Sequence, residues 1–151
     1  MSDILCLGAG NKPIAGAINH DIRKHRPEIA VAHNLNALPW PWADNSFDVI
    51  VARAVLEHLD IDLLTSMNEC WRLLRPGGEA QIKLPYWKAD SAYSDPTHRW
   101  FFSPDIFAGF DPDTERGKEY AFYTERKWQI VKGPRLNRAQ TSIYATLRVR
   151  K

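Results

Sequence analysis

Short apolar runs separated by turns rich in glycine and proline dominate the first half of the chain, and they predict β-strands. The expected strands cover residues 3–7, 17–21, 29–32, 47–52 and 80–84. Each run is too short for an ordinary helix, and turn-forming residues lie beside it. The run at 47–52 (FDVIVA) is also rich in the β-branched residues that favour buried strands. This half of the chain therefore predicts a sheet with few helices.

One segment between the expected strands has the apolar spacing of a helix. Apolar side chains recur at spacings of three and four after Asp60, at Leu63, Leu64, Met67, Cys70, Trp71 and Leu74. This spacing places them on one face of a helix, and the turn Pro76-Gly77-Gly78 ends it. Because a strand precedes the helix and another follows the turn, the segment predicts a parallel strand–helix–strand crossover.

The links between the first three expected strands are too short and too irregular for helices. Pro13 and Gly16 follow the first strand closely, and both residues disfavour a helix interior. We therefore expect helices to be missing there and one region of the sheet to lack helical cover. The loop that carries Trp40 and Trp42, or a second subunit in a homo-oligomer, is expected to cover it.

The second half of the chain is aromatic and irregular up to about residue 116. We expect a short helix near 104–110 and strands at 120–123, 128–131 and 141–150. In the last segment, apolar and polar residues alternate, which is typical of a strand with one exposed face. This final strand is expected to be antiparallel to the others.

Length and charge limit the classes of protein that fit this pattern. The chain has 151 residues, which predicts a single domain over 1–151. The formal net charge is +2, but residues 115–151 contain 10 basic and 3 acidic side chains. That basic quarter fits either a solvated strand face or a surface that attracts an anionic substrate or partner.

Cysteine content and hydropathy indicate the cellular setting. Two cysteines, Cys6 and Cys70, cannot form a disulfide framework, and no metal-ligand spacing involves them. His20, His25 and His33 also lack metal-ligand spacing, so we expect no metal. No signal-like start or membrane-length apolar run occurs. A cytoplasmic protein without a membrane partner is expected.

The turn Gly8-Ala9-Gly10 follows the first strand and allows the backbone to approach a ligand closely. It is not a dinucleotide fingerprint, because Pro13 replaces the third glycine and Asp21 comes too early for the usual acidic residue. Asp21, at the end of the second strand, could still accept hydrogen bonds from a vicinal diol. It could equally cap a turn.

Taken in order, several segments resemble motifs of class I S-adenosylmethionine-dependent methyltransferases. They are LGAG at 7–10, HD at 20–21, HNLNALPWPWADNSFDVI at 33–50, VLEHL at 55–59 and RLLRPGGEAQIKLP at 72–85. The segment DPTHRWFF at 95–102 is similar to one that recurs in small members. The resemblance implies an α/β, trimmed Rossmann-like sheet of order 3-2-1-4-5-7-6 and the cofactor S-adenosylmethionine.

The resemblance also implies roles for individual residues. Cofactor-binding positions would be Gly8, Ala9, Gly10, Asp21, Asn34, Leu35 and Arg53. Asp21 would hold the ribose hydroxyls, Asn34 would accept from the adenine amino group, and the Leu35 N–H would face the ring. Cys6 departs from the pattern, since the family usually has an acidic residue there; Asn11 or Lys12 could take over its role.

Catalytic residues are expected in the connection after the fifth strand, which lines the mouth of the cleft. Asp95 and His98 could form an orienter and base pair, although the same turn could simply cap the segment that follows. Tyr86, Trp87 and His58 are expected to line the substrate pocket. Glu57 and His58 could instead be structural residues of a helix start.

Three functions fit these observations. The first is a methyltransferase that acts on a small-molecule acceptor; the Asn/Asp-Pro-Pro-aromatic motif of DNA amino-methyltransferases is absent at 52–55. The second is a non-catalytic cofactor-binding or assembly protein, which Cys6 and the missing helix favour. The third, less favoured, is a nucleic-acid binder that uses residues 115–151.

Overall fold

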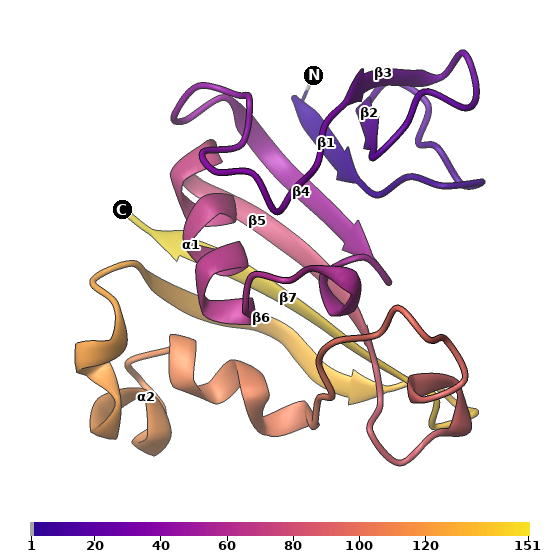
Figure 1. The fold of residues 1–151 in the computed structure, drawn as a ribbon. Helices are drawn as coiled ribbons and strands as arrows, with labels where there is room; N and C mark the ends of the chain where they lie inside the picture. Colours follow the sequence, from indigo (N-terminus) through magenta and orange to yellow (C-terminus); the bar gives the residue numbers. More distant parts are fainter. Residues whose placement is uncertain (1) are drawn as a thin grey trace.

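The computed structural model describes residues 2–151, which form one seven-stranded sheet with few helices (Figure 1). The strands are β1 (Ile4–Leu7), β2 (Ile18–Asp21), β3 (Ile29–Ala32), β4 (Phe47–Arg53), β5 (Leu74–Pro85), β6 (Lys127–Leu136) and β7 (Ser142–Arg150). The α-helices are α1 (Leu63–Leu73) and α2 (Glu115–Glu119). The 3₁₀ turns are η1 (Leu56–His58), η2 (Asp90–Ala92), η3 (Pro104–Phe110) and η4 (Ala121–Tyr123).

The order of the sheet is β3-β2-β1-β4-β5-β7-β6, as predicted. Strands β1 to β5 are parallel, and β7 runs antiparallel to both β5 and β6. The links from β1 to β2 and from β2 to β3 contain no helix, which confirms that part of the prediction. The carboxyl ends of the five parallel strands therefore meet at one edge, where ligands bind in open α/β sheets.

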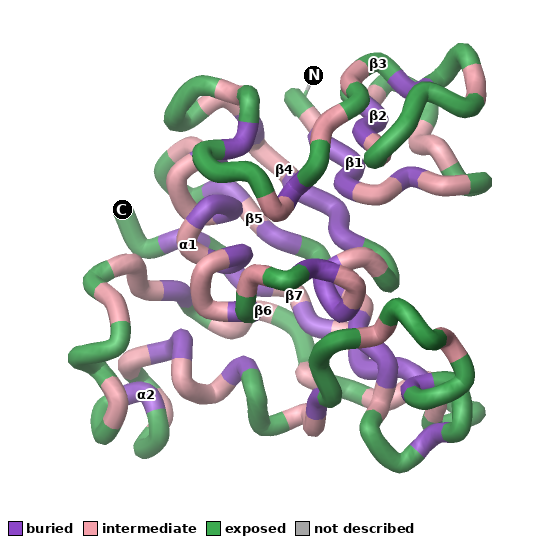
Figure 2. Tube along the Cα trace, viewed as in Figure 1, coloured by how far each residue is buried: buried purple, intermediate pink, exposed green. Residues whose placement is uncertain are grey.

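Helix α1 supplies most of the cover for one face of the sheet. Asp62 caps the helix, because its carboxylate accepts a hydrogen bond from the Thr65 N–H at 2.8 Å. The helix then buries Met67, Cys70 and Leu73 against the apolar side chains of β4 and β5. Figure 2 shows these central elements largely buried, with exposed loops around them.

The opposite face of β4, β5 and β7 is polar. Side chains alternate along β5, so that Ile82 joins the core with α1 while Gln81 and Lys83 point the other way. Among residues 2–151, the α-helices and 3₁₀ turns lie on the α1 face or at the ends of the strands. Around β4, β5 and β7 the main apolar core therefore lies on the α1 side, while a small second cluster of Cys6, Ala9 and Ile29 lies at β1 and β3.

The tryptophan loop does not cover this polar face, which corrects one of the two alternatives expected from the sequence; cover by a second subunit stays a prediction. Trp40 is buried on the α1 side, and its backbone N–H donates to Glu69 Oε2 at 2.8 Å. The carbonyl groups of Trp40 and Trp42 accept hydrogen bonds from Arg72, also on α1. These hydrogen bonds from the half-buried Arg72 guanidinium hold the loop on the α1 side.

Two further expectations differ from the structure. Residues 120–123 form no strand; they follow α2 and belong largely to η4, where the rings of Tyr120 and Tyr123 stack at 5.1 Å. The Thr114 hydroxyl accepts from the Gly117 N–H, which caps α2 and starts this helical stretch. The turn Pro76-Gly77-Gly78 lies within β5 rather than before it. No helix in the described residues is long and apolar enough to cross a membrane.

Candidate functional site

The glycine turn and Asp21 meet at the carboxyl ends of β1 and β2. The Gly10 N–H donates to Asp21 Oδ2 at 2.7 Å, and the Ile22 N–H donates to Asp21 Oδ1 at 2.7 Å. Each carboxylate oxygen keeps a further lone pair, so a vicinal diol could still bind there. The turn-capping role and the proposed diol-binding role of Asp21 are therefore compatible.

His20 fixes the position of this turn. Its Nδ1 accepts from the Gly8 N–H at 3.3 Å, and its Nε2 donates to the His33 carbonyl at 2.9 Å. Burial lowers the pKa of His20, which keeps the ring neutral in this arrangement. The ring thus ties the turn after β1 to the end of β3.

The segment expected to face the adenine ring is also tightly held. The Asn34 side-chain oxygen accepts from the Asn36 N–H at 3.0 Å, and one lone pair of this oxygen remains. Leu35 is buried, and its carbonyl accepts from the Trp40 indole N–H at 2.8 Å. The indole of Trp40 therefore helps to position residues 34–35, which are expected to border the adenine ring.

Cys6 has become a core residue rather than a ligand. It packs with Ala9 and Ile29, and the link between β1 and β2 covers it with Ile14 and Ala17. Burial raises the pKa of its thiol, so the side chain stays neutral. Asn11, one suggested replacement, already accepts a hydrogen bond from Arg26 at 2.9 Å.

The segment DPTHRWFF docks on η1, about forty residues earlier in the chain. The Arg99 N–H donates to the Glu57 carbonyl at 2.7 Å, and the Trp100 indole N–H donates to the Leu59 carbonyl at 2.7 Å. His58 Nδ1 lies 2.7 Å from Thr97 Oγ1. These contacts bring two motifs together just beyond the carboxyl end of β4.

Glu57, His58 and His98 form a cluster at this junction. The Nε2 atoms of His58 and His98 each lie 3.9 Å from Glu57 Oε1, and the two rings are 4.7 Å apart. Glu57 is 1% exposed, and its Oε2 has no hydrogen-bond partner among the described residues. Burial raises the pKa of Glu57 to about 7. Sequence reasoning named these residues separately but missed that they converge.

Asp95 is expected from the sequence either to orient His98 or to cap the turn that precedes Arg99. Asp95 Oδ1 accepts from the N–H and the hydroxyl of Thr97, and these bonds lower the pKa of Asp95. The carboxylate therefore caps the turn. Its Oδ2 lies 3.9 Å from His98 Nε2, too far for a hydrogen bond, whereas His98 Nδ1 lies 2.8 Å from the Ala92 carbonyl. The carbonyl, not Asp95, orients the ring.

Tyr86 and Trp87 follow β5 at the same edge of the sheet. The Trp87 N–H donates to the Phe102 carbonyl at 3.0 Å, which ties the segment after β5 to DPTHRWFF. Tyr86 packs against the core, whereas Trp87 is exposed with Lys88 over its ring. Only Tyr86 is thus half-buried, as a pocket-lining residue would be.

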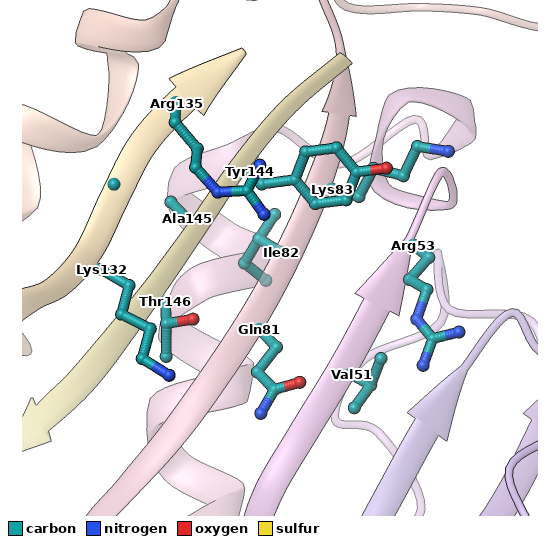
Figure 3. A pocket seen from close by; sticks show the side chains of 11 residues that line it. Val51, Arg53, Gln81, Ile82, Lys83, Lys132, Arg135, Tyr144, Ala145 and Thr146 are labelled. Carbon is teal, nitrogen blue, oxygen red and sulfur yellow. The ribbon is translucent and has the colours of Figure 1, made fainter. Parts of the chain in front are cut away.

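Arg53 follows Ala52, whose partner in β1 is Leu7, the residue before the glycine turn. Figure 3 shows its side chain at the border of a hollow on the polar face of the sheet, together with Lys83, Lys132 and Arg135. Tyr144 stands among them, with Lys83 Nζ 5.8 Å and the Arg135 guanidinium 5.1 Å from its ring centre. Arg53 therefore borders a cationic hollow, and its expected role in cofactor binding stays a prediction.

Comparison with known proteins gives a match over the first half of the chain. The family described as "Methyltransferase domain" matches residues 12–82. A protein of Mycolicibacterium smegmatis named "Probable S-adenosylmethionine-dependent methyltransferase" is 42% identical over 65 residues, which are 42% of this chain and 24% of that protein. Residues 12–82, a little under half of the chain, are therefore similar to the methyltransferase domain family. S-adenosylmethionine is the cofactor that this family indicates.

Solved structures agree with this methyltransferase fold. The YcgJ protein of Bacillus subtilis superposes with a TM-score of 0.59 at 15% identity, over 98% of this chain and 89% of that one. An S-adenosylmethionine-dependent methyltransferase of Archaeoglobus fulgidus gives a TM-score of 0.61 at 15% identity, over 98% and 86%. At these identities the likeness concerns the fold. The matched part covers about a quarter of the curated relative's length.

Several basic side chains of the C-terminal quarter pair within the fold. Arg148 pairs with Glu79 at 2.7 Å, and Arg150 pairs with Asp111 at 3.2 Å. Arg126 donates to the Asn68 carbonyl at 2.8 Å. Lys132 and Arg135 instead border the hollow. The charge excess therefore reflects internal pairing as well as one local cationic surface.

Proposed function

We propose that this chain transfers a methyl group from S-adenosylmethionine to a small-molecule acceptor. The observation that carries the proposal is the meeting of the glycine turn with Asp21, supported by the family match over residues 12–82. Asp21 would bind the ribose hydroxyls, and the segment at Asn34 and Leu35 would border the adenine. S-adenosylmethionine supplies an electrophilic methyl group on a sulfonium, so the protein mainly needs to orient the acceptor.

His98 and Asp95 are proposed to act on the acceptor side. The ring of His98 is oriented by the Ala92 carbonyl, so that Nε2 is the atom left to act toward the acceptor. His58 and Tyr86 lie in the same region and would line the acceptor pocket, with Trp87 at its rim. The cationic hollow around Lys83 and Arg135 favours an acceptor that carries negative charge.

Calorimetry with S-adenosylmethionine and S-adenosylhomocysteine tests the cofactor site. Asp21→Ala removes the carboxylate that would accept hydrogen bonds from the ribose hydroxyls. We therefore expect the affinity for both cofactor forms to fall by about 10- to 100-fold. Glu28→Gln removes an exposed carboxylate outside the proposed site and should bind as the native chain does. Absence of binding by the native chain, or equal affinity in Asp21→Ala, would contradict the proposal.

A methyl-transfer screen tests the acceptor class. It should pair carboxylate- or phosphate-bearing acceptors with their neutral amide or alcohol counterparts. We expect turnover of charged acceptors, with KM raised by Lys83→Gln and by Arg135→Gln. Cofactor binding without turnover of either group would instead support the alternative, a cofactor-binding or assembly protein without catalysis.

A further inference from the structure

The junction between η1 and DPTHRWFF has the composition of a metal centre. Glu57, His58 and His98 each offer one ligand atom, and these three atoms lie within 4.8 Å of one another. Two imidazoles and one carboxylate are a ligand set of zinc sites that keep an open coordination position. Neighbouring ligands of a tetrahedral zinc are about 3.3 Å apart, given bonds of about 2.0–2.1 Å, so small side-chain rotations would close the set.

Hydrogen bonds on the far sides of both rings present the correct nitrogen atoms. The Ala92 carbonyl can only accept, so His98 carries its proton on Nδ1 and its Nε2 lone pair is free. The Thr97 hydroxyl donates to Asp95 Oδ1, so His58 Nδ1 must donate to Thr97 Oγ1. Both Nε2 lone pairs are therefore available on the Glu57 side. Such outer hydrogen bonds are what orient histidines that bind metals.

Glu57 provides an independent observation. Its carboxylate is 1% exposed, and Oε2 is buried without a hydrogen-bond partner among the described residues. A buried carboxylate oxygen is costly to leave unpaired. Both Nε2 atoms stand 3.9 Å from Oε1, beyond hydrogen-bond distance, so neither histidine pairs with it directly. A cation between the three groups would satisfy this carboxylate.

We propose that Glu57, His58 and His98 bind a divalent zinc ion, with one coordination position left open toward the acceptor. Asp95 Oδ2, 3.9 Å from His98 Nε2, is near enough to act as an additional ligand or to hold a bound water. Nitrogen and carboxylate ligands of this kind favour zinc over magnesium or calcium. With zinc bound, the His98 Nε2 lone pair would hold the ion, and the open coordination position would face the acceptor in place of a free Nε2. Zinc binding itself does not depend on the proposed methyl transfer.

Titration of chelator-treated protein with Zn²⁺, against a chromophoric chelator, measures the site directly. We expect one zinc per chain, and a loss of affinity of more than about 100-fold in His98→Gln, above the loss typical of outer-shell changes. His25→Gln removes an exposed histidine outside the cluster and should leave the affinity unchanged. Co²⁺ should give the visible absorption of a four- or five-coordinate site in the native chain and in His25→Gln only.

Thr97→Val tests the orientation of His58 without removing a ligand. Thr97 is exposed, so the variant should keep the native Tm in the presence of EDTA while its zinc affinity falls by about 10- to 100-fold. Zinc should raise Tm in the native chain and not in His98→Gln. Equal zinc affinity in the native chain, His98→Gln and Thr97→Val, or a native chain without a cobalt band, would overturn the proposal. Because neither readout uses methyl transfer, failure here is distinguishable from failure of the proposed function.

Discussion

Gly8 lies directly against Val55: a Cβ on Gly8 would be 2.5 Å from Val55 Cγ2. Gly8 also has a φ of +58°, a conformation that side chains disfavour. This contact joins the turn after β1 to the start of η1. The close packing of the Gly8 backbone on the Val55 side chain therefore links the proposed cofactor turn to the segment that carries the proposed acceptor residue His58.

Gly8→Ala should consequently destabilise the fold. Steric overlap with Val55 adds to the backbone strain, and we expect a loss of about 2–4 kcal/mol in the free energy of unfolding. Gly16→Ala is a matched control, because Gly16 has a φ of +77° with open space around it and would carry the backbone strain alone. Urea unfolding measures both. An equal loss in the two variants would show that the Val55 contact contributes nothing.

Glu69 should make stability dependent on acidic pH. Burial raises its pKa, but hydrogen bonds from Arg72 and the Trp40 N–H outweigh this, so the pKa is lowered overall. A lowered carboxyl pKa contributes stability above the unfolded-state value, and the contribution is lost as pH falls through the folded-state value. The loss should therefore appear below about pH 4.5.

Glu69→Gln should show this effect in urea unfolding at several pH values. Near pH 7 we expect it to be about 1.5–3 kcal/mol less stable, because hydrogen bonds to a charged group are removed. The difference from the native chain should shrink below pH 4.5. Glu79→Gln, which alters a more exposed pair with Arg148, should change little. A pH-independent difference for Glu69→Gln would contradict the assignment.

The two thiols should be inert in the folded protein. Cys70 is fully buried and burial raises its pKa to about 12, so roughly one thiol in ten thousand would be ionised at pH 8. Cys6 is buried too, with a raised pKa. Labelling with a disulfide reagent should be slow in buffer, and both residues should react at once in guanidinium chloride. Rapid labelling of the native chain would show that these regions open readily.

The cationic hollow should lower stability at low ionic strength. Arg53, Lys83, Lys132 and Arg135 border it, and none forms an ion pair with a carboxylate among residues 2–151. Lys132→Glu should raise the free energy of unfolding by up to about 1 kcal/mol, and added salt should remove the gain. Arg148→Glu breaks a pair with Glu79 and should act in the opposite direction. A salt-independent gain would exclude charge repulsion as the cause.

The positions of most strands and of the crossover helix were predictable because they depend on local signals, whereas the strand order followed from the resemblance to class I methyltransferases. The helical spacing from Leu63 to Leu74, and the short links with Pro13 and Gly16, indicate where a crossover helix can and cannot form. The strand predicted at 120–123 was wrong. The aromatic composition of this run is typical of a strand, but Phe122 is 79% exposed and lies in η4. Composition alone could not reveal that this run lies outside the sheet.

The cluster of Glu57, His58 and His98 was not predictable from spacing. His98 is forty residues from His58, and the two meet only because DPTHRWFF docks on η1 through Arg99 and Trp100. Linear spacing, which gave no metal site, cannot describe a ligand set made by such docking. The cofactor side was more accessible to sequence reasoning, since Gly10 and Asp21 sit at the ends of adjacent strands.

Strand β5 has consequences for synthesis of the chain. Its partner on one side, β4, precedes it, whereas its partner on the other side is β7, which pairs with it from Pro85↔Ser142 to Glu79↔Arg148 and comes much later in the chain. During translation β5 therefore remains an open edge until β7 leaves the ribosome, and open edges invite pairing with other chains. The polar side chains of Gln81 and Lys83 on β5 thus also disfavour pairing of this edge with other chains before β7 is synthesised.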